Sequence, residues 1–495
     1  MMMKHAVSVL ILFLSCHFCA YSQIGIRKLT SIPRLADSVD VAYHSKKNGW
    51  RAGGMVFGVN MAVWTFDRFI QKGDFAYING HTIKENFRHG FIWDNDQMGT
   101  NMFLHPYHGS LYYNSARSNG YNYWQSGLYS FAGSWMWEMF MECEFPSTND
   151  IIATPIGGLA LGEVFYRTTD LILDDRARGN ARFGRELAAL LISPTRGLTR
   201  IINGEAWRKR PTSGKQFGVP EVYVEVSMGI RALELEDDIF DQGVGFGTEI
   251  NIEYGDRFDA ENKKPYDYFS VKAAINAQAS QPILGQLNII GRLASKDIWD
   301  TKKDYMSIGL YQHFDYYDSD TISAVSAKTP YKFCTPASFG VGLIYQNKRF
   351  KRWDVDAFAH ANAIILGGAL SDYYQVDERN YNLASGFSTK VGFNFVYKKG
   401  KFAASTFYEV YRMYTWKGYP DDIDWDDFNS KTLDAQGDKS KAILHAVSLR
   451  MDLRLKNNFY LTNINTAYSR ETHYKKFENV LSTTGESRLM LTYKF

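Results

Sequence analysis

The chain has 495 residues, a formal net charge of +3 at pH 7 and a mean hydropathy of −0.31. This hydropathy argues against a helical polytopic membrane protein, and no stretch after residue 22 reaches roughly 18 uninterrupted apolar residues. The small net charge predicts no nucleic-acid partner. Aromatic residues still make up 15% of the chain, which is typical of transmembrane β-barrels with aromatic girdles, an apolar outer face and a polar interior.

Residues 1–22 have the features of a secretory signal peptide. Lys4 precedes an apolar run at residues 6–14, and small residues lead to a cleavage site after Ser22. Cys16 could suggest a lipoprotein signal, but the residues before it fit that motif poorly. Cleavage removes one positive charge, so the net charge falls from +3 to +2.

Residues 23–80 predict a periplasmic lead-in. Within it, residues 54–69 are apolar, and their length does not decide between a short helix and a strand. After cleavage, Cys143 and Cys334 are the only cysteines. A disulfide between them could form, but a chain this large can bury a core without one.

Residues 81–212 predict a helical plug or cap domain. Residues 126–144 form a helix that is apolar nearly all round, and Pro146 ends it. Glu138 and Glu142 lie one turn apart on one face of this helix.

A second helix is expected at residues 150–170. Residues 147–150 supply capping chemistry before it, and Pro155 should kink it. Gly158 and Gly162 form a small-xxx-small pair, which lets another backbone approach closely. The two helices therefore predict a packed hairpin with a glycine seam.

An arginine-rich segment follows, with short helices expected at residues 181–192 and 195–202. Such charge usually forms a solvated face, although guanidinium groups could also pair with lipid phosphates. The arginines are Arg176, Arg178, Arg182, Arg185, Arg196, Arg200, Arg208 and Arg210, of which the last four are the phosphate-binding candidates.

Residues 213–495 predict an outer-membrane β-barrel. Apolar and polar residues alternate over long segments, as in residues 222–232, 244–254, 353–365 and 447–455. A continuous apolar face opposite a charged face suits a sheet with lipid on one side and a polar lumen on the other. A soluble sandwich rarely sustains so many strands longer than about ten residues.

The turns support a count of about twelve strands, an even number as expected for bacterial single-chain barrels. Tight turns at residues 346–350, 398–401 and 456–458 alternate with long loops at 317–333, 367–382, 418–440 and 471–486. The expected strands start near residues 217, 243, 266, 282, 305, 334, 350, 383, 401, 441, 458 and 487.

The C-terminal residues RLMLTYKF place Leu489, Leu491, Tyr493 and Phe495 on one face of the last strand. This ending resembles the signal read by the outer-membrane barrel assembly machinery. The fold class is therefore an α+β membrane protein of the cell outer membrane, with an N-terminal helical region followed by an antiparallel transmembrane β-barrel.

The helical region resembles a known family of Gram-negative outer-membrane proteins with a domain of unknown function. The resemblance rests on HPYHG at residues 105–109, PSTND at residues 146–150, the glycine pair at 157–158 and Gly162-Glu163. It covers residues 80–200 most specifically. Because the family lacks an assigned activity, the resemblance implies a location and an architecture and no catalytic residue.

His105 and His108 are the first candidates for chemistry. Two imidazoles three residues apart can bind a metal, but a third ligand is needed and none is fixed by the sequence. We therefore predict no metal and no cofactor, and interpret the pair as hydrogen-bonded structural histidines.

Four carboxylates in or at the ends of the apolar helices are the other candidates. Burying them is costly without partners, for which Arg117 and Arg167 are nearest in sequence. Glu138 with His105 or His108 could form a general acid/base pair, but structural ion pairing is the better interpretation. The four are Glu138, Glu142, Asp150 and Glu163.

No nucleophile elbow, H-E-x-x-H motif or phosphate loop is present. The acidic loop at residues 421–427 could bind calcium but lacks the EF-hand pattern, so a solvated outer loop is the default interpretation.

Two functions follow from these observations. The first is a non-enzymatic barrel for envelope structure or transport, with a helical plug or cap, and with outer-membrane lipids and the barrel assembly machinery as partners. The alternative is an enzyme that modifies envelope lipids, a hydrolase or acyl transferase acting through His105, His108 and Glu138. Convergence of these side chains on one open cleft would favour the enzyme.

Overall fold

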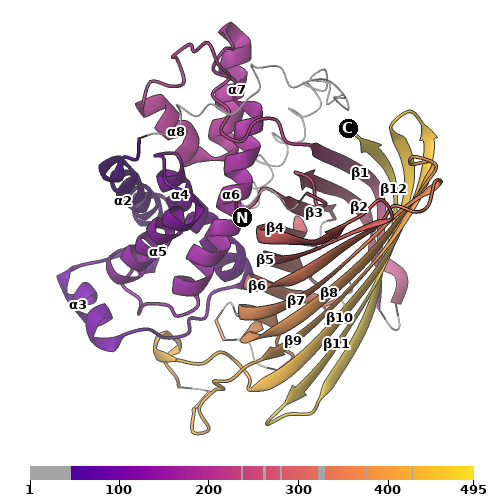
Figure 1. The fold of residues 1–495 in the computed structure, drawn as a ribbon. Helices are drawn as coiled ribbons and strands as arrows, with labels where there is room; N and C mark the ends of the chain where they lie inside the picture. Colours follow the sequence, from indigo (N-terminus) through magenta and orange to yellow (C-terminus); the bar gives the residue numbers. More distant parts are fainter. Residues whose placement is uncertain are drawn as a thin grey trace.

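The computed structural model describes residues 46–235, 238–259, 264–278, 281–321, 329–373, 376–377, 379–425 and 427–495. The predicted signal peptide lies outside these residues. A helical region stands beside a closed β-barrel, and the chain enters the barrel only after the helices are complete (Figure 1). The helical segments are α2 (Gly49–Phe66), η3 (Asp67–Gln71), η4 (Asp74–Ala76), α3 (Gly80–His89), η5 (Thr100–Leu104), α4 (His105–Arg117), α5 (Tyr123–Phe140), α6 (Asp150–Ile172), α7 (Gly179–Ile192) and α8 (Pro194–Ile202), with η6 (Ser430–Thr432) in a barrel loop.

The helical region begins earlier than expected. The apolar stretch whose structure was left open is α2, and it lies inside the predicted lead-in at residues 23–80. Its start is set by Asn48, whose side chain accepts a hydrogen bond from the Arg51 amide. The start of α5 carries a capping box between Asn122 and Gln125.

The predicted hairpin is present as α5 and α6, and the glycine seam of α6 packs against α4. A Cβ atom built on Gly158 would lie 2.5 Å from the carbonyl carbon of Gly109, and one built on Gly109 would lie 1.8 Å from the Thr154 carbonyl oxygen. The two backbones are therefore in direct contact, as the small residues predicted. The helix α6 continues through Pro155, and the Ser147 hydroxyl caps the Asp150 amide at 3.2 Å.

The barrel has twelve antiparallel strands, and β1 pairs with β12 to close it. This confirms the predicted strand number, although β12 starts before residue 487. The strands are β1 (Val222–Leu235), β2 (Asp238–Tyr254), β3 (Phe269–Ala277), β4 (Leu284–Asp300), β5 (Asp304–Asp318), β6 (Lys332–Asn347), β7 (Trp353–Leu370), β8 (Tyr381–Tyr397), β9 (Phe402–Tyr414), β10 (Ser440–Lys456), β11 (Phe459–Tyr474) and β12 (Val480–Lys494).

The alternation in sequence becomes two chemically different faces. On β10, Val447, Leu449 and Leu453 are exposed on the outside, whereas Arg450 and Asp452 pair with each other on the inside. An apolar exterior around a closed, polar-lined barrel is the architecture of an outer-membrane protein, because only such a sheet leaves no backbone group unpaired in lipid. Within the described part of the chain, no helix is both long and apolar enough to cross a bilayer.

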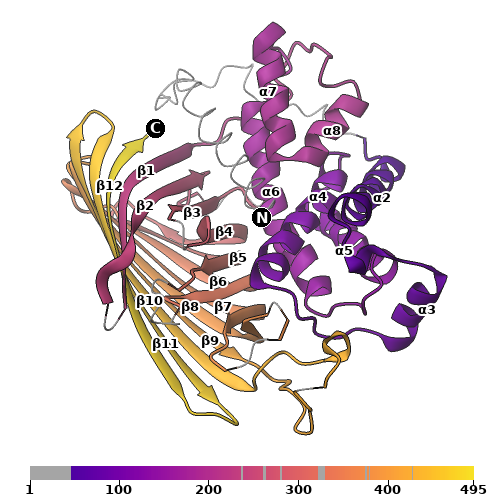
Figure 2. The ribbon, with the colours of Figure 1, turned by 180° about the vertical axis from the view of Figure 1, so that it is seen from behind.

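The helical region packs on the outer wall of this barrel. Along β5, Ile308 and Leu310 are exposed on the outer face, and Gln312, Phe314 and Tyr316 continue the same face but are buried. What buries them is the helical region, since α6 contacts β5 and β6 and one apolar cluster joins both parts. Both views show α6 next to the strands, with α2, α3 and α8 farther away (Figures 1 and 2). The helices therefore cover the wall instead of plugging the lumen.

Candidate functional site

A group of acidic side chains lies where the segment before α4 meets the ends of α5 and α6. Backbone hydrogen bonds from Ile92 to the Pro146 oxygen, 2.9 Å, and from Thr148 to the Ile92 oxygen, 2.6 Å, hold these segments together. We call the side chains of Asp94, His105, Glu138, Glu142 and Asp150 the acidic cluster. It gathers residues that are up to 56 positions apart in the chain.

The carboxyl groups of Asp94 and Asp150 are hydrogen-bonded neighbours in the acidic cluster, and their pKa values shift in opposite directions. Burial would raise the pKa of Asp94, but hydrogen bonds from Asp150, Ser147 and Asn101 lower it below its usual value. The pKa of Asp150 lies well above its usual value because the group is buried and faces the charge on Asp94. His105 Nε2 lies 3.6 Å from Asp150 Oδ2, and burial lowers the pKa of this imidazole.

Burial also favours the neutral forms of Glu138 and Glu142, which belong to the same cluster. Burial raises the pKa of Glu138 to about 8, and its carboxyl accepts a 2.8 Å hydrogen bond from the Ser147 amide. Burial and the neighbouring Glu138 raise the pKa of Glu142 well above its usual value. The Trp137 indole donates a hydrogen bond to Glu142.

His108 makes ring contacts beside the acidic cluster. Its imidazole lies edge to face with Trp137, with 5.0 Å between ring centres, and 4.5 Å from the Tyr112 ring. Burial lowers its pKa to about 3, so it is neutral. Its Nε2 is buried without a hydrogen-bond partner among the described residues, so ring contacts hold this neutral histidine and not the hydrogen bonds expected for it.

Glu163 belongs to a separate ion-pair group. Its carboxylate accepts hydrogen bonds of 2.9 Å from both Arg117 and Arg167, the two partners suggested by the sequence, and 2.6 Å from the Tyr113 hydroxyl. Burial would raise the pKa of Glu163, but the two guanidinium groups hold it below its usual value. The candidate residues therefore lie in two separate groups, one at the acidic cluster and one around Glu163.

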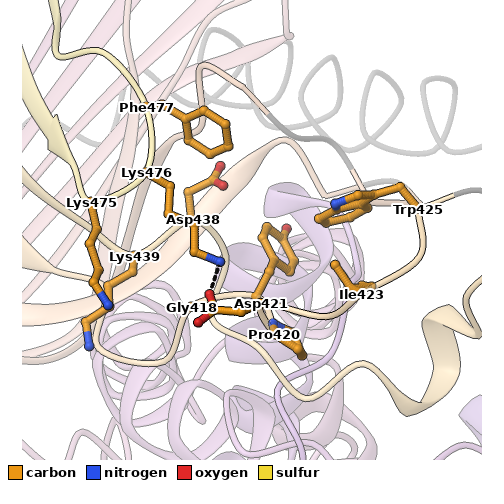
Figure 3. A pocket seen from close by; sticks show the side chains of 11 residues that line it. Gly418, Pro420, Asp421, Ile423, Trp425, Asp438, Lys439, Lys475, Lys476 and Phe477 are labelled. Carbon is orange, nitrogen blue, oxygen red and sulfur yellow. Dashed lines mark ion pairs between the residues drawn. The ribbon is translucent and has the colours of Figure 1, made fainter.

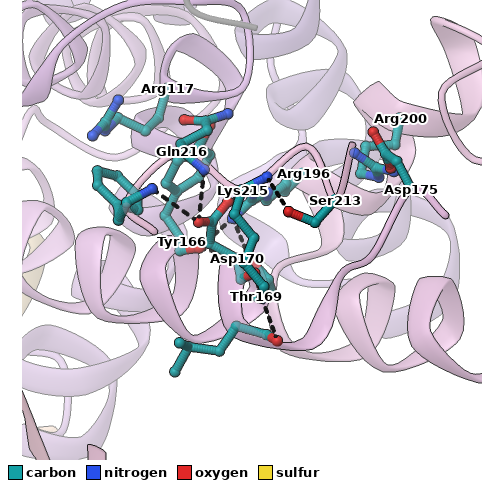
Figure 4. A network of polar contacts seen from close by, with 12 residues as sticks. Arg117, Tyr166, Thr169, Asp170, Asp175, Arg196, Arg200, Ser213, Lys215 and Gln216 are labelled. Atoms are coloured by element: carbon teal, nitrogen blue, oxygen red, sulfur yellow. Dashed lines mark hydrogen bonds and ion pairs between the residues drawn. The ribbon is translucent and has the colours of Figure 1, made fainter. Parts of the chain in front are cut away.

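The arginine-rich segment is only partly the solvated face expected for it, because Arg182, Arg196 and Arg200 are buried whereas Arg178 and Arg208 are exposed. Arg196 pairs with Asp170 at 2.9 Å, and its guanidinium lies 3.9 Å from the centre of the Tyr166 ring (Figure 4). Arg200 pairs with Asp175 at 2.6 Å and also with Glu186.

The last two phosphate-binding candidates lie after α8. Arg210 Nε lies 3.7 Å from Asp175 Oδ2, while Arg208 is exposed. Since Arg196 and Arg200 already have carboxylate partners, the geometry does not favour a lipid-phosphate site built from the four arginines.

The acidic cluster does not line an open cleft, because Glu138 is 1% and Asp150 3% exposed. Among the described residues, no group of three or more side chains is arranged to hold a metal. Cys143 and Cys334 are both free thiols. A pocket of about 320 Å³ lies elsewhere, at the barrel loops, and includes Asp421 of the acidic loop paired with Lys476 (Figure 3).

Sequence reasoning missed an aromatic layer across the lumen. The rings of Tyr317 and Phe333 stack with 4.4 Å between their centres, and Tyr331 and Tyr468 lie 4.5 Å apart. The rings of Tyr317 on β5 and Tyr468 on β11 also meet edge to face, with 6.5 Å between their centres, although these strands stand on opposite sides of the barrel. The signal was present, because aromatic residues occupy lumen-side positions at the loop ends of β5, β6, β9 and β11.

Below this layer the lumen holds ion pairs between strands. Lys390 Nζ on β8 lies 2.6 Å from both carboxylate oxygens of Asp315 on β5, and 3.2 Å from Glu409. Arg231 and Glu486 form a second fully buried pair. The polar inner face expected from the sequence is therefore a packed network.

Comparison with known proteins gives a family without an assigned role. Residues 90–195 match the family described as "Domain of unknown function (DUF3943)". This stretch contains the acidic cluster and the glycine seam. No curated protein matches the chain.

Several solved outer-membrane proteins resemble the barrel. The NanC porin is 9% identical, with 55% of this chain and all of that chain covered and a TM-score of 0.27. The channel DcaP of Acinetobacter baumannii is 11% identical over 56% of this chain and 96% of that one, with a TM-score of 0.24. An OmpT loop-deletion mutant of Vibrio cholerae is 9% identical over 56% and 98%, with a TM-score of 0.21. Because these scores are low, the fold assignment rests on the strand pairing itself.

Proposed function

We propose that this protein is a non-conducting outer-membrane barrel that anchors a helical domain on its outer wall, and that its role in the envelope is structural. The observation that carries the proposal is the contact between Tyr317 and Tyr468 across the lumen. Side chains from opposite strands meet there, so solutes have no continuous water-filled path at that level. The wall itself supplies this closure, without a plug.

The ion pairs below the aromatic layer support the same conclusion. Opening a path would expose or separate Lys390, Asp315 and Glu409, which are buried and held together by ion pairs from the one lysine to both carboxylates. Removing one member of such a group is strongly unfavourable because it leaves a buried charge without a partner. The closed lumen is therefore a stable arrangement and not a loose obstruction.

The helical domain is fastened to the wall by a specific polar contact. Gln312 faces outward from β5, where a barrel strand normally meets lipid. Its side-chain oxygen accepts hydrogen bonds from the hydroxyls of Tyr123, 2.6 Å, and Tyr266, 2.8 Å, and its amide donates to the Ile156 oxygen at 2.8 Å. A glutamine at this position would be costly in hydrocarbon. These three hydrogen bonds support a permanent interface between helices and barrel.

The lipid-modifying alternative has less support. His105, Glu138 and Asp150 do gather, but their carboxyls are buried and the phosphate-binding candidates Arg196 and Arg200 already have carboxylate partners. An enzyme needs a reacting group that its substrate can reach.

The test is electrical conductance after reconstitution into planar bilayers. We expect the wild-type protein to give no steady current above background. Replacing Tyr331 and Tyr468 together by alanine should open the lumen, whereas Tyr408→Ala on the outer wall is the matched control and should stay closed. Heat-modifiable migration in gels verifies that each barrel is folded. A steady porin-like current from the wild type would overturn the proposal.

A further inference from the structure

The helical region has an inverted distribution of side chains, and α5 shows it most clearly. Four large apolar residues of α5 are exposed, whereas four of its polar residues are buried. This is the reverse of a helix on a water-soluble domain, whose apolar stripe faces the core. The exposed residues are Trp124, Leu128, Phe131 and Trp135, and the buried ones are Ser126, Ser130, Ser134 and Glu138.

The helix α8 shows the same inverted distribution, with apolar residues exposed and two charged arginines buried. Its exposed residues are Leu198, Ile201 and Ile202, while Arg196 and Arg200 are each 3% exposed. These arginines turn inward to the carboxylates of Asp170 and Asp175 (Figure 4). The outer surface of α8 is therefore aliphatic. Large apolar side chains are also exposed on neighbouring segments, among them Phe57, Phe69, Phe183 and Trp207.

Exposing so much apolar surface to water is unfavourable, and large exposed apolar patches usually mark a surface that binds a protein partner, a ligand or a membrane. A bilayer selects the observed pattern, because ionisable groups in contact with lipid turn inward and pair while apolar side chains face the acyl chains.

The position of the helical region points to the same partner. On the outer face of β5, Ile308 and Leu310 face lipid, and the next residues of that face lie beneath the helices. At this level α6 therefore stands where lipid surrounds the rest of the barrel, while the segment before α4 contacts the loops after β7 and β9 through hydrogen bonds such as those from Arg379 to the Asp94 oxygen and from Asn95 to the Ser430 oxygen. The outer surface of the helices is therefore next to the same lipid that surrounds Ile308 and Leu310.

We propose that the exposed apolar residues of α5 and α8 contact the acyl chains of the outer membrane, so that the helical region is embedded in the bilayer beside the barrel. This inference goes beyond the anchoring role and does not depend on whether the lumen conducts. Lipid is the occupant that the inverted helices and the adjoining barrel surface both fit. A second copy of the chain would cover only the part of this apolar surface that lies in the interface between the copies.

The test uses the full chain in phosphatidylcholine vesicles, with single cysteines carrying a fluorophore. Cys16→Ser, Cys19→Ser and Cys143→Ser remove the other native thiols, and Cys334 is buried. Leu128→Cys and Ile201→Cys report on the helical region. Quenching is measured with nitroxide-labelled acyl chains and, separately, with iodide in the aqueous phase.

Two barrel positions calibrate the measurement. Leu449→Cys lies on the lipid-facing wall of β10, and Lys351→Cys lies in the exposed turn between β6 and β7. We expect positions 128 and 201 to match position 449, with loss of fluorescence from the acyl-chain nitroxide and little from iodide. Quenching by iodide to the extent seen at position 351 would overturn the inference. Protection from both quenchers, with cross-linking between copies at position 128, would overturn it in favour of a second copy.

Discussion

The glycine seam between α4 and α6 allows a demanding test of the helical packing, with Gly158→Ala as the perturbation. The added Cβ would lie 2.5 Å from the carbonyl carbon and 2.8 Å from the Cα of Gly109. Both atoms belong to backbone, so no side chain can rotate away. Ordinary contact begins at 3.4 Å, so the two helices must separate by about 1 Å, which forfeits roughly a quarter to a half of the dispersion energy at the contact.

The size of the effect follows from two opposing terms. Overpacking of a tight interface costs about 1–3 kcal/mol. Alanine has a higher helix propensity than glycine, which offsets about 1 kcal/mol. We therefore expect Gly158→Ala to lower the free energy of unfolding of the helical region by about 0–2 kcal/mol relative to the wild type, and by about 1–3 kcal/mol relative to a glycine-to-alanine change that meets no clash.

Gly54→Ala in α2 is the matched control, because nothing lies within 4 Å of the Cβ that it adds. The same chemical change should stabilise that helix by about 0.5–1 kcal/mol. The assay is urea unfolding of the full chain in detergent, followed by far-ultraviolet circular dichroism at the helical signal. If Gly158→Ala were as stable as Gly54→Ala, the direct backbone contact would be refuted.

Three further predictions concern the wall, the acidic cluster and the lumen. Gln312→Leu leaves the Tyr123 hydroxyl without its acceptor, so proteolysis should cut the helical region faster while the barrel stays heat-modifiable; an unchanged digestion rate would argue against this interface. The pKa of Glu138 is about 8 when folded and 4.5 ordinarily, so its contribution to stability is complete below pH 4.5 and is lost as the pH rises towards 8. Glu138→Gln should therefore have a higher urea midpoint than the wild type at pH 9 but not at pH 4, and equal pH profiles would contradict this. Lys390→Met strands the buried charge of Asp315 and should destabilise the barrel by about 3–5 kcal/mol, measured as the temperature of gel-shift loss; an unchanged temperature would contradict the buried pairing.

The sequence by itself determined the barrel and the helical seam. In a strand the side chains alternate between faces, so the pattern at residues 447–455 specifies which side meets lipid before any pairing is known. Turn lengths then divide the chain into strands, and the count of twelve follows. The close approach of another helix backbone at Gly158 could also be predicted, because small residues one turn apart in an apolar helix usually mark a helix–helix contact. These are local features, which depend only on neighbouring residues.

The tertiary structure alone decided where the helices stand and what they face. The polar residue Gln312 interrupts an outward apolar face, and its meaning depends on hydroxyls of Tyr123 and Tyr266 that come from distant segments. The acidic cluster likewise forms only when separate helices meet. The spacing of apolar and charged residues predicts an apolar face and a charged face for α8, but it does not predict which of the two faces is buried. Arg196 could meet water or Asp170 with the same sequence pattern. Only the packing shows that the charges point inward, since the environment of each face is set by its neighbours in space and not along the chain.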